Sequence, residues 1–375
     1  MDMMNSNGTK LCPPTLKPWK KDAHKRSVAV LMSGGADSTA ACLLLKRQDR
    51  NVLGITMRIP VLQDAEMPSR ELDDNIAAVC RELDIAHYFV DVQSEFEKLV
   101  VDAVRAAYLR GETPNPCATC NRDIKFGLVW DFLREEFGVS CLATGHYARI
   151  LNRYGRSCLA RATDKTKDQS YFLYGVALNR LAGLVLPLGE LTKEQVRSTA
   201  RELNLTVAEK AESMELCFAG EGDYRSALIG AEANRDGDIT DMQGNKIGTH
   251  KGIANYTLGQ RKGIGFAGGK PLYVGKINAQ TNTIALGARE QISFSTVRAR
   301  RINTLVPEEL VAQKRVYGKI RSYGDPAPCR IIDVGDDDMS VEFDKPQFAP
   351  CPGQRLVLYN KDDNIIGGGS ISSCS

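Results

Sequence analysis

The sequence predicts an α/β protein with a doubly wound parallel sheet, followed by a small glycine-rich central domain and a C-terminal β-barrel. From residue 27 to about residue 185, short apolar runs alternate with amphipathic segments, which is the order expected of βαβ units. After Phe218 glycine becomes frequent and helical periodicity disappears. From about Ile292 onward, short alternating runs are separated by turns that contain glycine and proline, as is typical of a small barrel or sandwich.

The first domain is expected to contain alternating strands and helices. Buried apolar runs predict strands at Ser27–Met32, Val52–Met57, Ala86–Val92 and Cys141–Thr144. Apolar residues at helical spacing predict helices at Ser38–Arg47, Glu71–Leu83, Phe96–Leu109 and Ile124–Phe137. Thr192 is the expected N-cap of a further helix, because Glu194 and Gln195 stand in its first turn.

Strand signals in the last domain are short and regular. They fall at Arg315–Ile320, Cys329–Val334, Met339–Phe343 and Arg355–Tyr359. The predicted organisation is a disordered basic tail over 1–24, an α/β domain over 25–218, a central domain over 219–290 and the barrel over 291–375.

Composition limits the class of protein. Of the 375 residues, 43% are hydrophobic and 25% are charged, as in ordinary soluble globular proteins. The net charge of +3 does not by itself indicate a nucleic-acid partner. No apolar run approaches the roughly 20 residues that cross a bilayer, and the N-terminus lacks the apolar region of a secretory signal, so a cytoplasmic protein without membrane contact is expected. The eleven cysteines are irregularly spaced, which argues against a secreted disulfide scaffold.

A glycine-containing loop, Ser33-Gly34-Gly35-Ala36-Asp37-Ser38, lies between the first predicted strand and the first helix. Two glycines let the backbone approach a phosphate closely, and the helix N-terminus favours an anion. The serine hydroxyls can donate hydrogen bonds, and Asp37 can hold a magnesium ion. A plain turn with an N-cap would use similar residues, but the strand–loop–helix order favours a nucleotide site, to which we also assign Leu31 and Met32. The loop has no lysine of the kind found in kinase and GTPase loops.

This loop resembles the SGGxDS loop of the ATP pyrophosphatases (the PP-loop superfamily), which bind ATP and cleave it to AMP and pyrophosphate. The resemblance implies that a substrate oxygen attacks the α-phosphate of ATP and becomes adenylated. The superfamily also includes enzymes that act on small-molecule acids. The loop alone therefore leaves the substrate open.

Further motifs resemble those of the tRNA-specific 2-thiouridylases (MnmA). They occur in order along nearly the whole chain. They comprise Thr113–Asn121 with Ile124-Lys125-Phe126, Ala143–Arg149, Lys167–Leu173, Glu215–Phe218, Tyr256–Gly263 and Pro352-Gly353-Gln354. The resemblance implies ATP- and magnesium-dependent replacement of the C2 oxygen of the wobble uridine, position 34, by sulfur. It also implies that the domains grip the tRNA anticodon arm and that a persulfide-carrying donor protein, or sulfide, supplies the sulfur.

Thiolation needs an activated oxygen, a sulfur nucleophile and a second thiol that releases the sulfur. By the resemblance, Cys120 matches the family's nucleophile and Cys217 the cysteine that carries the persulfide. It further implies that the two close into a transient disulfide when sulfur is delivered. Pro114 and Pro116 are expected to stiffen a mobile catalytic loop that carries Cys120.

Cys117 departs from the family, which usually has Asp at this position. The change leaves the general acid and base unassigned. It also creates three thiols, Cys117, Cys120 and Cys217, that could ligate a 4Fe–4S cluster with one open iron. The alternatives are that Cys117 is an extra redox thiol or a neutral substitution.

The resemblance assigns the remaining site residues. Met57 is expected beside the adenine and Gly145 in the ATP site. The residues implied in contacts with the target base or tRNA are Asn115, Pro116, Cys117, His146, Lys167, Asp168, Gln169, Arg321, Ser322 and Gln354. Ser322 replaces the usual Tyr, and Gln354 is expected near a uridine that has left its stack.

Two other functions are compatible with parts of the sequence. One is another ATP pyrophosphatase that acts on a small-molecule acid, as a ligase or amidotransferase without tRNA. The other is a tRNA-binding module without catalysis. The paired cysteines and the extra barrel favour thiolation over the first, and the intact phosphate loop favours it over the second.

Overall fold

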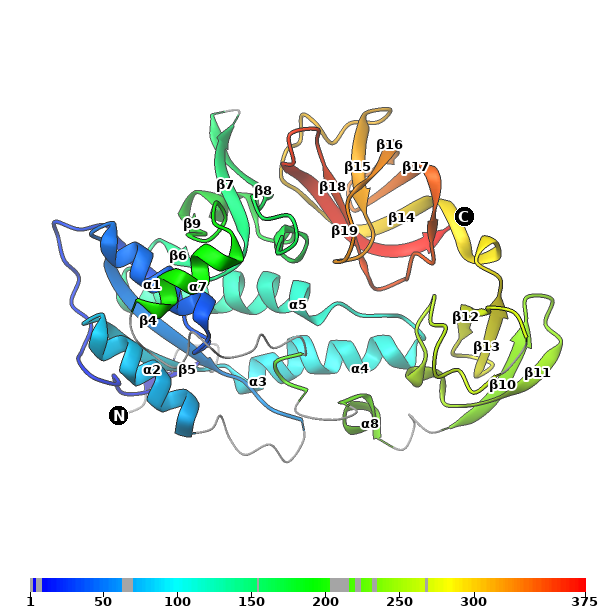
Figure 1. Cartoon of the computed structure of the whole chain (residues 1–375), viewed down its shortest axis with the longest axis horizontal. Coiled ribbons are helices and arrows are strands. Elements are labelled where there is room, and N and C mark those ends of the chain that lie inside the picture. Colours follow the sequence, from blue (N-terminus) through cyan, green and yellow to red (C-terminus); the bar gives the residue numbers. More distant parts are fainter. Residues whose placement is uncertain are drawn as a thin grey trace. The chain divides into compact units, whose positions relative to one another are not determined.

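The computed structural model describes residues 3–4, 9–62, 70–153, 155–202, 216–219, 224–230, 235–266 and 269–375. The chain divides into two compact units (Figure 1). Unit 1 comprises residues 1–99 and 117–220, and unit 2 comprises residues 100–116 and 221–375. The segment 100–116, which the sequence analysis assigned to the first domain, therefore belongs to unit 2. No helix in the described ranges has the length and apolar character needed to span a bilayer.

Unit 1 is built on a seven-stranded sheet in the order β1-β2-β5-β4-β3-β6-β9. The strands are β1 (Met3–Met4), β2 (Lys10–Leu11), β3 (Ser27–Leu31), β4 (Asn51–Arg58), β5 (Ala86–Asp91), β6 (Leu142–Ala143) and β9 (Leu184–Val185). The five strands from β5 to β9 are parallel, and the chain turns outward on both sides of β3. The predicted doubly wound sheet is thus confirmed. In a doubly wound sheet, ligands bind at the carboxyl ends of the two strands between which the strand order reverses. Here these strands are β3 and β6.

Helices cover this sheet and bury its apolar residues. They are α1 (Ala36–Arg47), α2 (Arg70–Glu82), α3 (Gln93–Phe96), α5 (Pro116–Thr119), α6 (Trp130–Phe137) and α7 (Lys193–Arg201). Leu45 of α1 and Ile76 of α2 are fully buried, and a side chain of this kind stabilises the fold by roughly 1.5–3 kcal/mol. Thr192 caps α7 in a capping box with Gln195, as the sequence predicted.

Two predicted helices differ from the structure. The helix expected at Phe96–Leu109 starts earlier and contains a π-helical turn, Glu97–Val101 (η1), between α3 and α4 (Asp102–Leu109). The helix expected at Ile124–Phe137 begins at Pro116 and runs through α5 and a π-helix, Cys120–Val129 (η2), into α6. Proline suits the first position of a helix, so Pro116 starts this helix instead of stiffening a loop. Cys117 and Cys120 therefore lie on helical backbone.

The N-terminal segment is ordered where the structure describes it. β2 pairs with the edge strand β5, and Leu11 is buried. The Thr15 hydroxyl lies 2.7 Å from Nδ1 of His87, and the Trp19 backbone N–H donates to the Tyr88 hydroxyl at 2.9 Å. The disordered tail expected over 1–24 is therefore not found over 9–24, because this segment covers an otherwise open sheet edge.

Smaller elements complete unit 1. The strands β7 (Ala148–Arg153) and β8 (Arg156–Arg161) form an antiparallel pair after β6. The 3₁₀ helices η3 (Ser170–Leu173) and η4 (Leu178–Gly183) follow. Residues 148–183 therefore leave the sheet directly after the carboxyl end of β6 and return to it at β9.

Unit 2 contains a four-stranded sheet and a closed six-stranded barrel. The sheet has the order β11-β10-β13-β12, with β10 (Asp236–Asp241), β11 (Lys246–Lys251), β12 (Tyr273–Asn278) and β13 (Thr283–Gly287). Alongside lie α4, α8 (Tyr224–Ile229), η7 (Ile253–Asn255) and η8 (Glu290–Ile292). Arg105 of α4 donates from Nε to the carbonyl of Leu228 at 2.7 Å, which ties segment 100–116 to this unit.

The barrel has the order β14-β17-β16-β15-β18-β19 and confirms the predicted C-terminal architecture. Its strands are β14 (Ser293–Thr304), β15 (Arg315–Lys319), β16 (Ala327–Val334), β17 (Asp338–Phe348), β18 (Arg355–Tyr359) and β19 (Ile365–Cys374). The sequence pattern predicts β15 to β18 but not β14 and β19. β19 contains Gly367-Gly368-Gly369, where an alternating pattern cannot be recognised.

His87 makes the stability of unit 1 depend on pH. Its ring is fully buried, with Nε2 2.9 Å from the Thr56 hydroxyl, and burial lowers its pKa from 6.5 to about 4, with help from the Arg58 charge. The unfolded chain therefore binds more protons between these values. The stabilisation is complete above pH 6.5 and is lost as the pH falls toward 4.

We predict that the thermal unfolding midpoint falls more between about pH 7.5 and pH 5 in the natural protein than in His87→Gln. Equal falls would contradict this.

Candidate active site

The phosphate loop joins β3 to α1 at the carboxyl edge of the sheet. Gly34 has a φ of 71°, a left-handed conformation that favours glycine. The Ser33 backbone N–H donates to the Ser38 hydroxyl at 3.2 Å, and that hydroxyl donates to the Gly35 carbonyl at 3.1 Å. These bonds fold the loop back onto the start of α1. A helix N-terminus and loop amides that are not bonded within the loop can together form an anion site.

The residues beside the loop that are predicted to bind the nucleotide lie at the ends of neighbouring strands. Leu31 and Met32 are buried at the end of β3, where Met32 is held by bonds to the Ile55 carbonyl and the Thr56 hydroxyl. Met57 lies half-buried near the end of β4, which pairs in parallel with β3. The strand register thus brings Met57 to the edge where the loop begins.

Gly145 follows β6 and packs directly against the phosphate loop. A Cβ built on Gly145 would lie 2.9 Å from the backbone carbonyl carbon of Asp37 and 3.0 Å from the Ser38 nitrogen. Only glycine permits this approach. The predicted ATP residues from two distant sequence segments are therefore in contact.

Asp37 is held by two residues that the sequence analysis did not include in the site. The Lys193 ammonium donates to both carboxylate oxygens, at 2.8 and 3.0 Å, and the Tyr147 hydroxyl donates to Oδ1 at 3.0 Å. Tyr147 stands within the quoted Gly145-His146-Tyr147 motif, and Lys193 directly follows the predicted N-cap Thr192. Carboxylate oxygens are ligands that magnesium prefers, so Asp37 suits the ion in kind, but a metal here would displace the Lys193 ammonium.

The three thiols of interest differ in exposure. Cys120 is buried at the start of η2, whereas Cys117 and Cys217 reach solvent, and all three are free thiols. Burial raises the pKa of Cys120 to about 12, and the Lys125 charge opposes this rise. The surrounding protein also raises the pKa of Cys117 and of Cys217, with Lys125 again acting in the opposite direction. Cys120 is therefore a protonated thiol at neutral pH.

Lys125 is the common cation of this thiol group. It lies five residues after Cys120, which is the hydrogen-bonding period of the π-helix η2 that contains both. The nearby Asp123 pairs with Arg122 at 2.7 Å, and within the described ranges no carboxylate pairs with Lys125. The Lys125 charge therefore lowers the pKa values of Cys117, Cys120 and Cys217 and is not offset by a paired carboxylate among the described residues. The Ile124-Lys125-Phe126 motif contained this residue, but a lysine in a motif does not reveal which neighbours it faces.

His146 lies between the phosphate loop and the π-helix η2. It follows Gly145, its Nδ1 lies 2.8 Å from the Thr144 hydroxyl, and its ring centroid lies 6.1 Å from that of Phe126 in η2. Burial lowers its pKa to about 3, and the Lys125 charge contributes. His146 is therefore neutral, and Lys125 acts on it as well as on Cys117, Cys120 and Cys217.

Known proteins match this chain over nearly its full length. Residues 26–221 match the family described as "tRNA methyl transferase HUP domain", 228–288 the "tRNA methyl transferase PRC-barrel domain" and 294–371 the "Aminomethyltransferase beta-barrel domain". The tRNA-specific 2-thiouridylase of Clostridium botulinum (strain Alaska E43) is 38% identical, covering 93% of this chain and 98% of its own length. That of Moorella thermoacetica is 40% identical, covering 92% and 99%. This chain belongs to the tRNA-specific 2-thiouridylase family.

Solved structures show only distant likeness. The U34-tRNA thiolase from Methanococcus maripaludis with its [4Fe-4S] cluster is 19% identical, with a TM-score of 0.33, and the match covers 55% of this chain and 64% of that one. NMN synthetase from Francisella tularensis is 16% identical, with a TM-score of 0.33, over 50% and 67%. Neither likeness bears on the function of this 2-thiouridylase family member.

The segment Lys167–Leu173, which is predicted to contact tRNA, is held by hydrogen bonds within the protein. The Asp168 side chain is 1% exposed and accepts bonds from Arg161 Nε, the Ala162 and Ser170 backbone N–H groups and the Ser170 hydroxyl. Gln169 exchanges two bonds with the Tyr147 backbone, at 2.8 and 2.9 Å. The Asp168 carboxylate thus organises the segment, and contact of Lys167, Asp168 and Gln169 with tRNA remains a prediction.

Unit 2 holds the other predicted tRNA residues. Gln354 donates from Nε2 to the carbonyls of Thr113 and Pro114, at 3.1 and 3.0 Å, beside the buried Asn115. Arg321 donates from Nη2 to the carbonyls of Phe348 and Ala349 at 2.8 and 2.5 Å, and Ser322 is exposed. The Gln354 amide therefore secures the segment that leads into α5, and its contact with an extruded base is still a prediction.

The residues present do not form a cluster-binding group as they are placed. Within the described part of the chain, no three His, Cys, Asp or Glu side chains are arranged to ligate a metal ion. Cys117, Cys120 and Cys217 share an electrostatic environment without forming such a set. In the described part of the chain these thiols therefore offer no assembled ligand set for a 4Fe–4S cluster.

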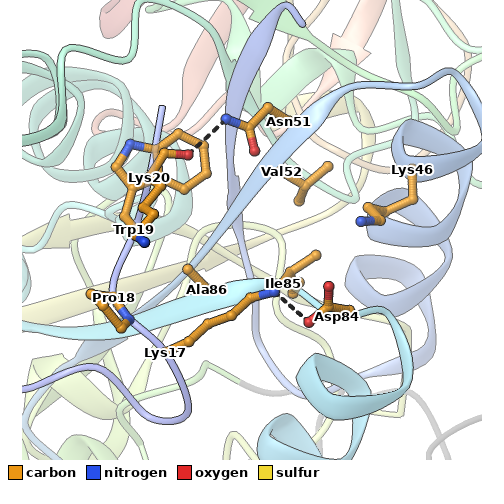
Figure 2. A pocket seen from close by; sticks show the side chains of 10 residues that line it. All are labelled: Lys17, Pro18, Trp19, Lys20, Lys46, Asn51, Val52, Asp84, Ile85 and Ala86. Atoms are coloured by element: carbon orange, nitrogen blue, oxygen red, sulfur yellow. Dashed lines mark hydrogen bonds and ion pairs between the residues drawn. The ribbon is translucent and has the colours of Figure 1, made fainter. Parts of the chain in front are cut away.

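A pocket of about 300 Å³ lies at the opposite edge of the sheet (Figure 2). Asn51 and Ala86, at the amino ends of β4 and β5, line it, together with Lys17, Trp19 and Asp84. Lys17 pairs with Asp84, and Asn51 donates to the Lys20 carbonyl at 3.1 Å. Ligands of open α/β sheets bind at the carboxyl ends of the strands, so this pocket is not the nucleotide site.

The contact at Gly145 gives a direct test of the nucleotide site. The Cβ of Gly145→Ala would push the loop backbone at Asp37 and Ser38. We predict at least about tenfold weaker binding of an α,β-methylene ATP analogue, or about 1.4 kcal/mol, measured by calorimetry. Gly248→Ala is the control, because its Cβ would have no neighbour nearer than 3.7 Å. Unchanged affinity in Gly145→Ala would refute the site.

Thiol reactivity tests the role of Lys125. Because Cys117 and Cys217 are exposed and Cys120 is buried, iodoacetamide at neutral pH should label Cys117 and Cys217 first, which peptide mass spectrometry can follow. Lys125→Met should slow labelling of both by about threefold to tenfold, because loss of the positive charge raises their pKa values. The buried Cys42 serves as the unreactive reference. Equal rates in the two proteins would contradict this electrostatic role.

Proposed function

We propose that this protein replaces the C2 oxygen of uridine 34 in the anticodon arm of tRNA by sulfur, at the expense of ATP. The observation that supports this most strongly is the path from Asp37 through Gly145 and His146 to Lys125 and Cys120 within unit 1. It relates the loop Ser33–Ser38 to Cys120 through the Lys125 charge. Family membership supports the same reaction, and we place the reaction in the cytoplasm.

The first step activates the uridine. The C2 oxygen attacks the α-phosphorus of ATP, the bond to the bridging oxygen breaks and pyrophosphate leaves with that electron pair. Amides of the loop Ser33–Ser38 and the N-terminus of α1 hold the negative phosphate oxygens. A magnesium ion, when bound, would be held by Asp37 and would neutralise phosphate charge. The uridine then carries AMP on its C2 oxygen.

The second step delivers sulfur. Cys217, loaded as a persulfide by a donor protein, attacks C2 with its terminal sulfur, and AMP leaves with the former C2 oxygen. The Cys120 thiolate then attacks the Cys217 sulfur of the S–S bond. The outer sulfur leaves on C2 as 2-thiouridine, and Cys120 and Cys217 become a disulfide. An external thiol must reduce this disulfide before another turnover. Because the pKa of Cys120 is raised, its thiol has to give its proton to water before the thiolate attacks.

Serine variants of the two cysteines test these assignments. We predict that Cys120→Ser and Cys217→Ser lower 2-thiouridine formation at least about a thousandfold, since neither can complete covalent transfer. Both should bind the ATP analogue as the natural protein does. Nucleoside analysis of tRNA by mass spectrometry gives the first readout and calorimetry the second. Substantial thiolation by either variant would overturn its assigned role.

Replacement of Cys117 distinguishes two sources of the sulfur, a persulfide on Cys217 and sulfide on an iron–sulfur cluster. With a persulfide on Cys217, Cys117→Asp should keep activity within about threefold, because Cys117 forms no covalent bond in the scheme. Protein purified without oxygen should then contain no stoichiometric iron. If iron is present and is lost together with activity in Cys117→Asp, the persulfide route is wrong and sulfide on a cluster supplies the sulfur.

A further inference from the structure

The phosphate loop contains no cation of its own. Loops of kinases and GTPases carry a lysine that binds the terminal phosphates, whereas Ser33–Ser38 has only neutral side chains and Asp37. A triphosphate brought beside the Asp37 carboxylate would be repelled unless a positive charge stands between them. The fold supplies one from a segment more than 150 residues away, because Lys193 lies 156 positions after Asp37 in the sequence.

Packing of α7 against α1 places this lysine. Val196 and Ala200 of α7 are fully buried in the same core as Ala40 and Ala41 of α1. Lys193 is the first residue of α7, and the capping box of Thr192 and Gln195 fixes the helix start. The Lys193 backbone N–H also donates to Oδ2 of Asp164 at 3.2 Å. The backbone of Lys193 is therefore anchored, and its side chain is the part that can move.

The Lys193 side chain is positioned for exchange. Its ammonium lies 2.8 Å from the Asp37 carboxylate and 5.6 Å from the centre of the Tyr147 ring, and the side chain is 14% exposed. Asp37 keeps a second donor, the Tyr147 hydroxyl at 3.0 Å. Asp37 therefore stays oriented if the ammonium departs. The flexible four-carbon stem of lysine permits a shift of a few ångströms without backbone movement.

We propose that Lys193 is a positioning residue with two successive partners: its ammonium first holds Asp37 toward the loop and then moves to the phosphate oxygens of the bound nucleotide. A magnesium ion that accompanies the nucleotide would be held by Asp37 in place of the ammonium. Each negative group keeps one positive partner throughout the exchange. The identity of the nucleotide rests on the proposed function.

Binding measurements on the full chain test this. The ligand is α,β-methylene ATP with magnesium, followed by calorimetry, and adenosine is the comparison ligand without phosphates. Lys193→Met should bind the triphosphate at least about tenfold more weakly and adenosine equally well. Lys193→Arg, which keeps the charge, should stay within about threefold. Lys165→Met removes an exposed lysine of the turn that follows β8. Its affinity for the triphosphate should match that of the natural protein.

A double variant distinguishes misfolding from loss of binding. The natural protein distinguishes failure of the lysine exchange from failure of the proposed function. Asp37→Asn/Lys193→Met removes both charges of the pair, so its thermal unfolding midpoint without ligand should recover toward that of the natural protein, while triphosphate binding stays weak. Triphosphate binding by Lys193→Met equal to that of the natural protein would overturn the exchange and leave a purely structural ion pair. Absence of triphosphate binding by the natural protein itself would instead refute the proposed function.

Discussion

The contact between the phosphate loop and the segment after β6 is the constraint on which the site depends. β3 and β6 are adjacent parallel strands, so the loops that follow them leave the sheet side by side. Gly145 has no side chain to separate them, and Asp37 lies against it. One strand pairing thus places the loop Ser33–Ser38 beside His146, which lies against the helix that carries Cys117 and Cys120. A bulkier residue at Gly145 would separate the two halves of the chemistry.

Two carboxylates of this site pair with cations, whereas no carboxylate of the described residues pairs with Lys125. Asp37 is matched by Lys193, and Asp123 is matched by Arg122, which leaves the Lys125 charge for the thiols and for neutral His146. Burial keeps Cys120 protonated in spite of Lys125. A cysteine held in its thiol form is protected from oxidation until the substrate arrives. This arrangement suits an enzyme that must first adenylate its substrate and only then release a reactive sulfur.

Much of this organisation could be predicted from the sequence, and what could not has physical reasons. The parallel sheet, the phosphate loop, the capped α7 and the barrel follow from local periodicity and turn residues. The helical setting of Cys117 and Cys120 was missed because two prolines suggested a loop, although Pro116 starts a helix. Lys193 and Tyr147 were missed because their relation to Asp37 is tertiary. Cys217 was recognised by its motif, and the structure describes only 216–219 around it.

Thiolation by adenylation can be tested in a single turnover of protein that carries a radioactive persulfide, incubated with tRNA and ATP without a reductant. Thiolation by adenylation predicts one AMP, one pyrophosphate and one Cys120–Cys217 disulfide for each labelled 2-thiouridine formed. Transfer of the label to tRNA without AMP, or without the disulfide, would contradict the claim that the phosphate loop and the two cysteines act on the same uridine.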